Sequence, residues 1–468
     1  MSTLTHVTAA GRAPGITGLL VLSLGALDLG LEQSIILPAL PALGEHYDAS
    51  PTATGWLVTG FLLASVVSIP LFGRLGDLYG KRRLILASLV SFATGSLVCA
   101  LTDWIGLAIA GRVLQGLGAA VGPLTYALAR DAFAPEFVPR AIGVVVGAAS
   151  VGSAIGYLLS GLLVEISATA IFWFLFALPI VLGLALFAIV PESTVRAPVS
   201  LDVAGASLLG TGLFMLLLGI SKGRDWDWLS GRTLGVFAAA LALLSAFVLV
   251  ERRVRQPLVD LSLVVRRPFA NTNVCAFAFG YSFFTAAFLL PAIAATPEAS
   301  GYGSGLSTLR VGLVLFPTGI ATLLSSWASG RLVDRIGPRA LVAVGSLISL
   351  AGYVSLALAH SSPFALGAGS AIVGLAWGFV LTGVAAVVVR SAPADTTGVA
   401  VAVMAVTRNT AVSIGAQVTF AIVIGAGLSG GFAAEEGYER AFWLAAAGAV
   451  VTLVSARLMP ARPARAAD

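Results

Sequence analysis

Charge is scarce in this chain: Asp, Glu, Lys and Arg make up only 10% of its 468 residues, whereas apolar residues make up 58%. Soluble domains carry about 25% charged residues, so this composition excludes an ordinary soluble protein. Lysine is almost absent, and Lys81 and Lys222 precede Arg82 and Gly223 rather than Ser or Thr. The phosphate-binding loop of an ATP-driven pump needs Ser or Thr after its lysine. The sequence therefore offers no site of that kind.

Cysteine and histidine are also rare. Cys99 and Cys275 both lie in apolar runs, which favours packing over a disulfide or a metal pair. His6, His46 and His360 are scattered and have no metal-ligand spacing. No metal, no other cofactor and no enzymatic site are expected. Basic residues are spread over alternate loops, so a nucleic-acid partner is not expected either.

Long apolar runs, by contrast, are abundant. A run of about 20 apolar residues can cross a ~30 Å hydrocarbon layer as a helix. Fourteen such runs lie near 15–42, 54–72, 84–101, 105–127, 140–164, 168–190, 203–221, 232–250, 269–296, 309–329, 340–359, 364–389, 397–427 and 439–458. The sequence predicts an all-α integral membrane protein with 14 transmembrane helices.

The positions of Lys and Arg test this count, because positive charge in short loops favours the cytoplasmic side. With fourteen spans, most of the 27 basic residues fall on the side of the N-terminus. Thirteen or fifteen spans would scramble that segregation. We therefore expect a multi-pass protein of the inner (plasma) membrane with both termini cytoplasmic.

One short charged loop occurs twice. Residues 73–83 read GRLGDLYGKRR and residues 330–339 read GRLVDRIGPR, each after an apolar run, which predicts two related halves. Glycine permits close helix approach, while the aspartate and the basic cluster can latch the cytoplasmic faces of the halves together. The alternative is that the basic residues only anchor topology. The expected gate residues are Gly73, Asp77, Gly80, Arg82, Arg83, Asp334 and Arg335.

Two acids and a buried arginine carry the expected chemistry. Asp28 and Glu32 are four residues apart and share one face of the first helix. They cannot both ionise at low cost in a low dielectric, so at least one is expected to hold a proton. At 1.5 Å per residue, Arg112 lies about 10 Å below the outer surface, a depth that allows contact with Glu32, while Arg408 lies nearer Asp28. The alternatives are static ion pairs between the halves and an Arg112 that reaches the headgroups.

Further motifs occupy the first, fourth and fifth spans. They are Leu31-Glu32-Gln33-Ser34-Ile35-Ile36-Leu37-Pro38-Ala39-Leu40-Pro41, then Arg112-x-x-Gln115-Gly116-x-Gly118-Ala119-Ala120, and the spaced glycines Gly143, Gly152 and Gly156. With the repeated loop, they make the chain resemble the major facilitator superfamily, and within it the fourteen-helix drug:proton antiporters. The resemblance covers essentially the whole chain.

The resemblance implies an architecture and a coupling group. It implies two six-helix pseudo-symmetric halves, residues 1–195 and 251–468, joined by an inserted helix pair in residues 196–250. It also implies that Arg112 takes part in proton coupling, beside Asp28 and Glu32. The family pattern is altered at several positions: Ser34, Leu37, Leu78, Tyr157 and Ser160 stand where Thr, Asn, a basic residue, Pro and Gly are usual.

The expected function is a proton-coupled secondary active exporter, an antiporter of amphipathic or cationic small molecules such as drugs or antibiotics, working by alternating access. The alternative is a dedicated metabolite exporter or importer, or a facilitator with weak or no proton coupling, because Tyr157 replaces the family proline. The partners would be the small-molecule substrate, protons and the lipid bilayer, with a proton gradient instead of a cofactor and a monomeric protein. Candidates for the substrate cavity are Gln115, Tyr157, Asn271, Asn273, Tyr281, Arg408 and Asn409.

Overall fold

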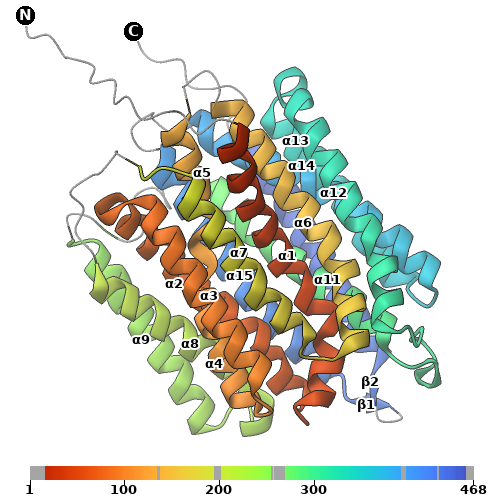
Figure 1. Cartoon of the computed structure of the whole chain (residues 1–468). Helices are drawn as coiled ribbons and strands as arrows, with labels where there is room; N and C mark the ends of the chain where they lie inside the picture. Colours follow the sequence, from red (N-terminus) through yellow and green to blue (C-terminus); the bar gives the residue numbers. More distant parts are fainter. Residues whose placement is uncertain are drawn as a thin grey trace, which may run out of the picture.

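The structure is a bundle of long antiparallel helices (Figure 1). This computed structural model describes residues 16–133, 138–193, 202–254, 257, 269–391, 397–429 and 432–459. The helices are α1 (Ile16–His46), α2 (Pro51–Tyr79), α3 (Lys81–Leu101), α4 (Ile105–Leu117), η1 (Gly118–Ala120), α5 (Val121–Ala132), α6 (Val138–Ile166), α7 (Ala170–Ile189), α8 (Val203–Trp226), α9 (Gly231–Glu251), α11 (Phe269–Ala295), η2 (Glu298–Ser300), α12 (Thr308–Ile336), α13 (Pro338–Leu358), α14 (Pro363–Ser391), α15 (Thr397–Gly425) and α16 (Glu435–Leu458). A short hairpin pairs β1 (Leu428–Ser429) with β2 (Phe432–Ala433).

The expected membrane spans coincide with these helices. Within the described residues, thirteen segments are long and apolar enough to cross a membrane, and α4, η1 and α5 together form one of them. The last-but-one expected span, 397–427, coincides with α15, which is not among the thirteen. The all-helical membrane architecture is confirmed, while the count of fourteen spans stays a prediction.

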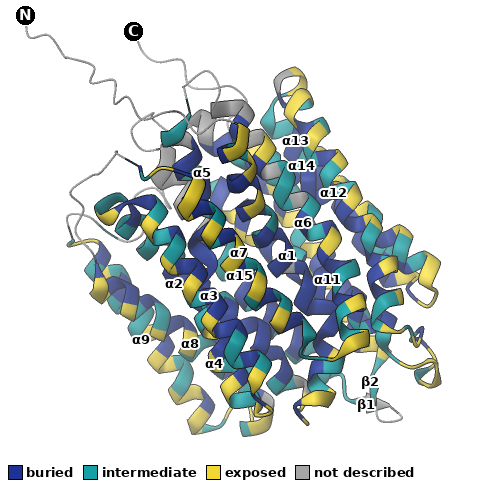
Figure 2. Ribbon diagram, viewed as in Figure 1, coloured by how far each residue is buried: buried dark blue, intermediate teal, exposed yellow. Residues whose placement is uncertain are grey.

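The surface of the bundle is apolar and part of its interior is polar. Figure 2 shows exposed residues along the outward faces of the helices. The exposed side chains include large apolar ones such as Leu184, Leu241 and Trp327. Polar side chains such as Thr59 and Ser96 are fully buried. Burying polar groups while exposing large apolar ones is unfavourable in water, so the outward faces suit lipid.

Along the chain, the α8–α9 hairpin lies between two groups of helices, which we call the first group (α1–α7) and the second group (α11–α16). We call the end of the bundle where α1 begins and α16 ends the near end, and the opposite end the far end (Figure 1). Helix α8 contacts both groups, since it packs on α2 and α15. Its Ser221 accepts a hydrogen bond of 2.9 Å from the indole of Trp56 in α2.

Both copies of the repeated loop turn at the near end through a glycine with positive φ. Gly80, between α2 and α3, has φ 110°, and Gly337, between α12 and α13, has φ 83°. Residues with a side chain rarely adopt this conformation, so glycine is required at the same point of each copy. The sharp turn lets each pair of long helices run antiparallel.

The two groups touch closely toward the far end. A Cβ on Gly161 or Gly319 would collide with the other group's Leu309 or Ala154, so α6 and α12 are in backbone contact there. Gln417 of α15 donates a short hydrogen bond to Thr59 of α2. Nearer the near end, a Cβ on Gly73, Gly147 or Gly330 would meet no atom within 4 Å among the described residues, and the same holds for Gly231 and Gly425 at the far end.

Candidate functional site

The two acids of α1 lie inside the bundle. Asp28 is 1% exposed and Glu32 is 5% exposed, one helical turn apart as expected. Neither carboxylate oxygen of Asp28 has a hydrogen-bond partner among the described residues. A buried carboxylate without a partner costs several kcal/mol if it is ionised. Asp28 therefore differs from an ordinary structural acid, which would be paired.

Helix α6 holds the acid-bearing turn of α1 at backbone distance. A Cβ on Gly152 would collide with the carbonyl of Leu27, and one on Gly30 would collide with the carbonyl of Ala149. Ser153 of α6 also donates a 3.2 Å hydrogen bond to the carbonyl of Gly30. Gly152 of the fifth-span motif thus allows α6 to pack closely onto the turn that carries Asp28.

Arg112 is fixed by groups of its own helix and of α2. It is 2% exposed, and its Nε donates a 2.7 Å hydrogen bond to the carbonyl of Leu57. Its Nη1 donates a short hydrogen bond to Oε1 of Gln115, and its guanidinium lies 4.7 Å from the ring centroid of Phe61. Gln115 in turn donates to Ser96 of α3 at 2.6 Å. This network holds a cation rigidly inside the first group.

The expected pairing of acids with arginines is not present in this conformation. The charges of Glu32 and Arg112 interact, but these two described residues form no ion pair within 4.0 Å. Arg408 donates to Asn409 at 3.4 Å and interacts electrostatically with Tyr126 of α5 rather than with Asp28. The expected Glu32–Arg112 and Asp28–Arg408 contacts are therefore wrong for this state.

Around Lys81, in the first copy of the repeated loop, the ion pairs lie within the first group. Lys81 Nζ lies 2.5 Å from Asp131 Oδ2 and 3.7 Å from Asp77 Oδ1. Among the described residues, Lys81 is the one ion-pair partner of Asp77. Asp77 thus forms no ion pair with the second group within the described residues, and the latch between the groups stays a prediction. A Cβ on Gly73, which was expected to allow close helix approach, would meet no atom within 4 Å among them.

The second copy of the loop is described only in part. Arg335 is exposed in the last turn of α12, whereas the side chain of Asp334 lies outside the described residues. The expectation for Asp334 therefore stays a prediction.

Comparison with known proteins shows the family to which the chain belongs. A sequence profile of the Major Facilitator Superfamily matches residues 22–416. The chain belongs to the Major Facilitator Superfamily. It is 31% identical over 418 residues to the tetracenomycin C resistance and export protein of Streptomyces glaucescens, covering 86% of this chain and 76% of that protein. It is 28% identical over 414 residues to the multidrug resistance protein Stp of Mycobacterium tuberculosis, covering 86% and 74%.

A solved structure of the same superfamily shares the fold. The human organic anion transporter MFSD10 superimposes with a TM-score of 0.65 at 19% identity, over 96% of this chain and 100% of that one. The superfamily consists of transporters rather than enzymes, in agreement with the expected lack of enzymatic chemistry.

The cavity candidates of this superfamily member do not gather at one place. Asn271 donates a 3.0 Å hydrogen bond to the carbonyl of Leu458, so it tethers the end of α16 at the near end. Tyr157 is buried where α6 meets α12, and its carbonyl lies against Gly312. Gln115 belongs to the Arg112 network. The other candidates lie on α11 and α15: Asn273 is buried, and Tyr281, Arg408 and Asn409 are partly buried.

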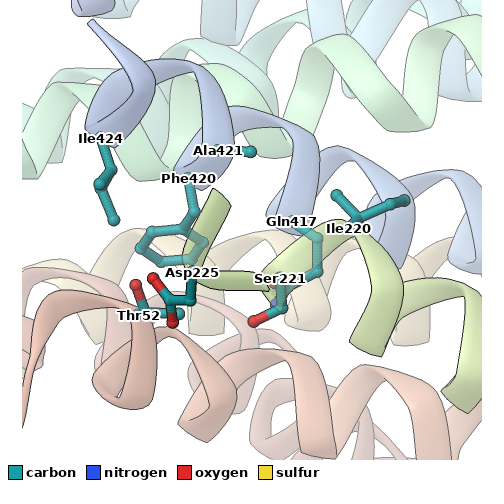
Figure 3. A pocket seen from close by; sticks show the side chains of 8 residues that line it. All are labelled: Thr52, Ile220, Ser221, Asp225, Gln417, Phe420, Ala421 and Ile424. Atoms are coloured by element: carbon teal, nitrogen blue, oxygen red, sulfur yellow. The ribbon is translucent and has the colours of Figure 1, made fainter. Parts of the chain in front are cut away.

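A small recess of about 20 Å³ lies between α2, α8 and α15 (Figure 3). Its lining side chains are those of Thr52, Ile220, Ser221, Asp225, Gln417, Phe420, Ala421 and Ile424. Pockets for drug-sized ligands have volumes of about 300–1,000 Å³, so this recess holds water at most. It marks a packing seam where the hairpin helix α8 meets both groups.

The structure adds residues that the sequence did not single out around the near-end loop. Glu192, which follows α7, accepts hydrogen bonds from the backbone N–H groups of Arg82 and Arg83 at 2.9 and 3.1 Å, and so caps α3. Ser193 donates a 2.6 Å hydrogen bond to Asp131. The sequence signal available was modest: both acids lie just past apolar runs, on the side expected for the basic cluster.

A second overlooked contact joins the chain after α9 to α2. Arg74 donates a short hydrogen bond to the carbonyl of Pro257. Burial lowers the pKa of Arg74, and the nearby carboxylates of Glu251 and Asp202 oppose that shift. Helix α8 begins beside Asp202 and helix α9 ends at Glu251. The start of α8 and the end of α9 therefore both interact electrostatically with Arg74 of α2.

Proposed function

We propose that this protein is a proton-coupled exporter of amphipathic or cationic small molecules, such as drugs or antibiotics. The observation that carries the proposal is the unpartnered, buried carboxylate of Asp28, one turn from Glu32 and in a bundle that also buries Arg112. The roles of its relatives in tetracenomycin C export and multidrug resistance support the direction and the substrate class.

In this proposal, the buried acids carry protons. An unpartnered carboxylate in a low-dielectric site is neutral, so Asp28 holds a proton in this conformation. A shift of α1 against α4 within the first group would bring Glu32 within ion-pair distance of Arg112, where Glu32 would ionise and release a proton. The charge interaction between Glu32 and Arg112 without a closed ion pair supports this coupling.

The proposal also assigns the ends of the bundle. The near end faces the cytoplasm, both termini are cytoplasmic in the inner (plasma) membrane, and a single chain is the transport unit. Residues 1–195 and 251–468 are the two pseudo-symmetric halves, and residues 196–250 are the inserted pair. The close contacts of α6 with α12 and of α2 with α15 toward the far end support a state that faces the cytoplasm.

In this state the latch at Asp77 is open. We propose that Asp77, Arg82 and Arg83, with Asp334 and Arg335, join the halves when the transporter faces outward. The present contacts of Lys81 with Asp131 and Asp77 would then fix the position of the loop between α2 and α3 until the halves meet.

Transport by the purified chain in proteoliposomes tests the proposal. A gradient that drives protons into the compartment at the cytoplasmic face of the protein should drive uphill movement of a cationic test compound out of that compartment. Collapse of the gradient with a protonophore should reduce the movement to equilibration. Equal transport with and without the gradient would favour the alternative, which is a facilitator or a dedicated metabolite transporter with weak or no proton coupling. The observation that supports this alternative is Tyr157, which stands in place of the family proline.

A further inference from the structure

Three side chains of metal-binding type meet at the far end of the second group. His360 lies between α13 and α14, Glu435 opens α16, and Glu439 follows one turn later. Their ligand atoms, an imidazole nitrogen and two carboxylate oxygens, all lie within 4.8 Å of one another. Transport as proposed above makes no use of this cluster.

The hydrogen bonds of His360 leave a lone pair facing a carboxylate. Nδ1 lies 2.8 Å from the carbonyl of Leu356, which can only accept, so Nδ1 carries the proton. Nε2 lies 3.2 Å from Oε1 of Glu435. A neutral imidazole has one N–H, so Nε2 is then an acceptor opposite another acceptor. A positive centre between these two atoms would resolve the conflict.

Either a second proton on the ring or a metal ion supplies such a centre, and the geometry favours the metal. An imidazolium needs one carboxylate, whereas this cluster presents two on one face of α16. Bonds of about 2.05 Å to a tetrahedral Zn²⁺ place neighbouring ligand atoms about 3.3 Å apart, close to the 3.2 Å between Nε2 and Oε1. A metal-binding histidine also typically donates its other N–H to a carbonyl or carboxylate, as Nδ1 does here.

Burial and access also fit a bound ion. The side chain of His360 is 4% exposed, so its ring is held in place, while that of Glu435 is 47% exposed and leaves a path from solvent. The neighbouring acid Glu436 is engaged elsewhere, in an ion pair of 2.7 Å with Arg440. Histidine with carboxylates is a donor set that suits Zn²⁺ among the divalent ions.

We infer that His360, Glu435 and Glu439 form a binding site for a divalent transition-metal ion, of which Zn²⁺ fits best, with water completing its coordination. The ion joins the turn after α13 to the first turns of α16. All three ligands belong to the second group, so the ion stabilises the far end of that group without bridging to the first. This inference departs from the expectation of no metal site, which rested on the scattered histidines alone.

Zinc binding to the full-length, tag-free protein in detergent tests the inference. After treatment with EDTA and its removal, ZnCl₂ should bind with one ion per chain and raise the midpoint of thermal unfolding. Glu439→Gln should weaken zinc binding by about tenfold or more, and His360→Ala should abolish it. Because Glu439 is only partly buried, its variant keeps the test valid even if His360→Ala does not fold.

Two variants serve as matched controls. Glu436→Gln removes the neighbouring acid outside the cluster, and His46→Ala removes another far-end histidine, which lies 3.5 Å from Asp103. Both should bind zinc like the wild type. Absence of saturable zinc binding, wild-type affinity in Glu439→Gln, or loss of binding in His46→Ala would overturn the inference. A midpoint of thermal unfolding that changes with pH but not with added zinc would identify a simple imidazolium–carboxylate pair. That result would also overturn the inference.

Discussion

Gly152 of α6 lies against the carbonyl of Leu27 in α1, one residue before Asp28. Any side chain at position 152 would push α6 away from the turn that carries the unpartnered acid. The position of Asp28 thus depends on a glycine of another helix, and the fifth-span motif acts on the turn that carries this acid through packing.

Gly152→Ala should therefore impair both stability and transport. The added methyl group meets backbone atoms that cannot rotate away, and overpacking of this kind costs about 1–3 kcal/mol. We expect a lower midpoint of thermal unfolding and slower gradient-driven transport. Gly147→Ala is the matched control on the same helix, because its methyl group would enter open space. Equal behaviour of the two variants would refute the packing argument.

Arg112→Lys keeps the positive charge but loses the planar guanidinium, which donates several hydrogen bonds in fixed directions. The guanidinium holds the carbonyl of Leu57 and the amide of Gln115 at once, whereas an ammonium is a compact point charge on a flexible stem. Each lost charged hydrogen bond is worth about 1.5–3 kcal/mol, so transport should fall by about tenfold to a hundredfold. Initial rates in proteoliposomes measure this, with Arg440→Lys at the surface as control. Normal rates in the Arg112→Lys variant would show that charge alone suffices.

Asp131→Asn should destabilise the near end of the first group. It leaves the buried Lys81 ammonium with only the longer contact to Asp77, and removing one partner of a buried pair costs roughly 3 kcal/mol. Asp77→Asn should cost less. Thermal unfolding of both variants and of the double variant Lys81→Met/Asp131→Leu provides the check. The double variant should recover part of the loss, and a further loss would contradict the assignment of this pair.

Gln417→Leu should loosen the far-end seal. The amide of Gln417 joins α15 to Thr59 of α2, across the contact between the two groups. Without it, states open at the far end should be populated more often, so Thr52→Cys in the adjoining recess should react faster with a maleimide. The background carries Cys99→Ala and Cys275→Ala, both native thiols being buried. Labelling that is unchanged by Gln417→Leu would show that this hydrogen bond does not govern opening.

Much of the fold could be predicted because the periodic signals are local. Apolar runs located each long helix of the described residues, although α2 and α12 continue past their runs to Tyr79 and Ile336, and the repeated loop located both turns that need a glycine. The interior position of Asp28 and Glu32 followed from their spacing on one helix. These features depend on short stretches of sequence and on the thickness of a bilayer.

The partners of the buried charges could not be predicted in the same way. Depth along a helix follows from residue number, but the rotation of one helix against another does not. Arg112 was expected to face Glu32, yet α4 turns it toward Leu57 of α2. Glu192 and Asp131 were missed for a related reason, because they reach the Lys81 loop from distant parts of the chain.

Gradient-driven export by Asp28→Asn and Glu32→Gln tests the central claim most directly, with the exposed Glu45→Gln on the same helix as control. Each variant is reconstituted in proteoliposomes, and uphill transport under a proton gradient is compared with exchange of labelled for unlabelled compound without one. We expect both variants to lose uphill transport while Glu32→Gln keeps measurable exchange, and Glu45→Gln to match the wild type. Unimpaired uphill transport in both variants would contradict proton coupling through these acids.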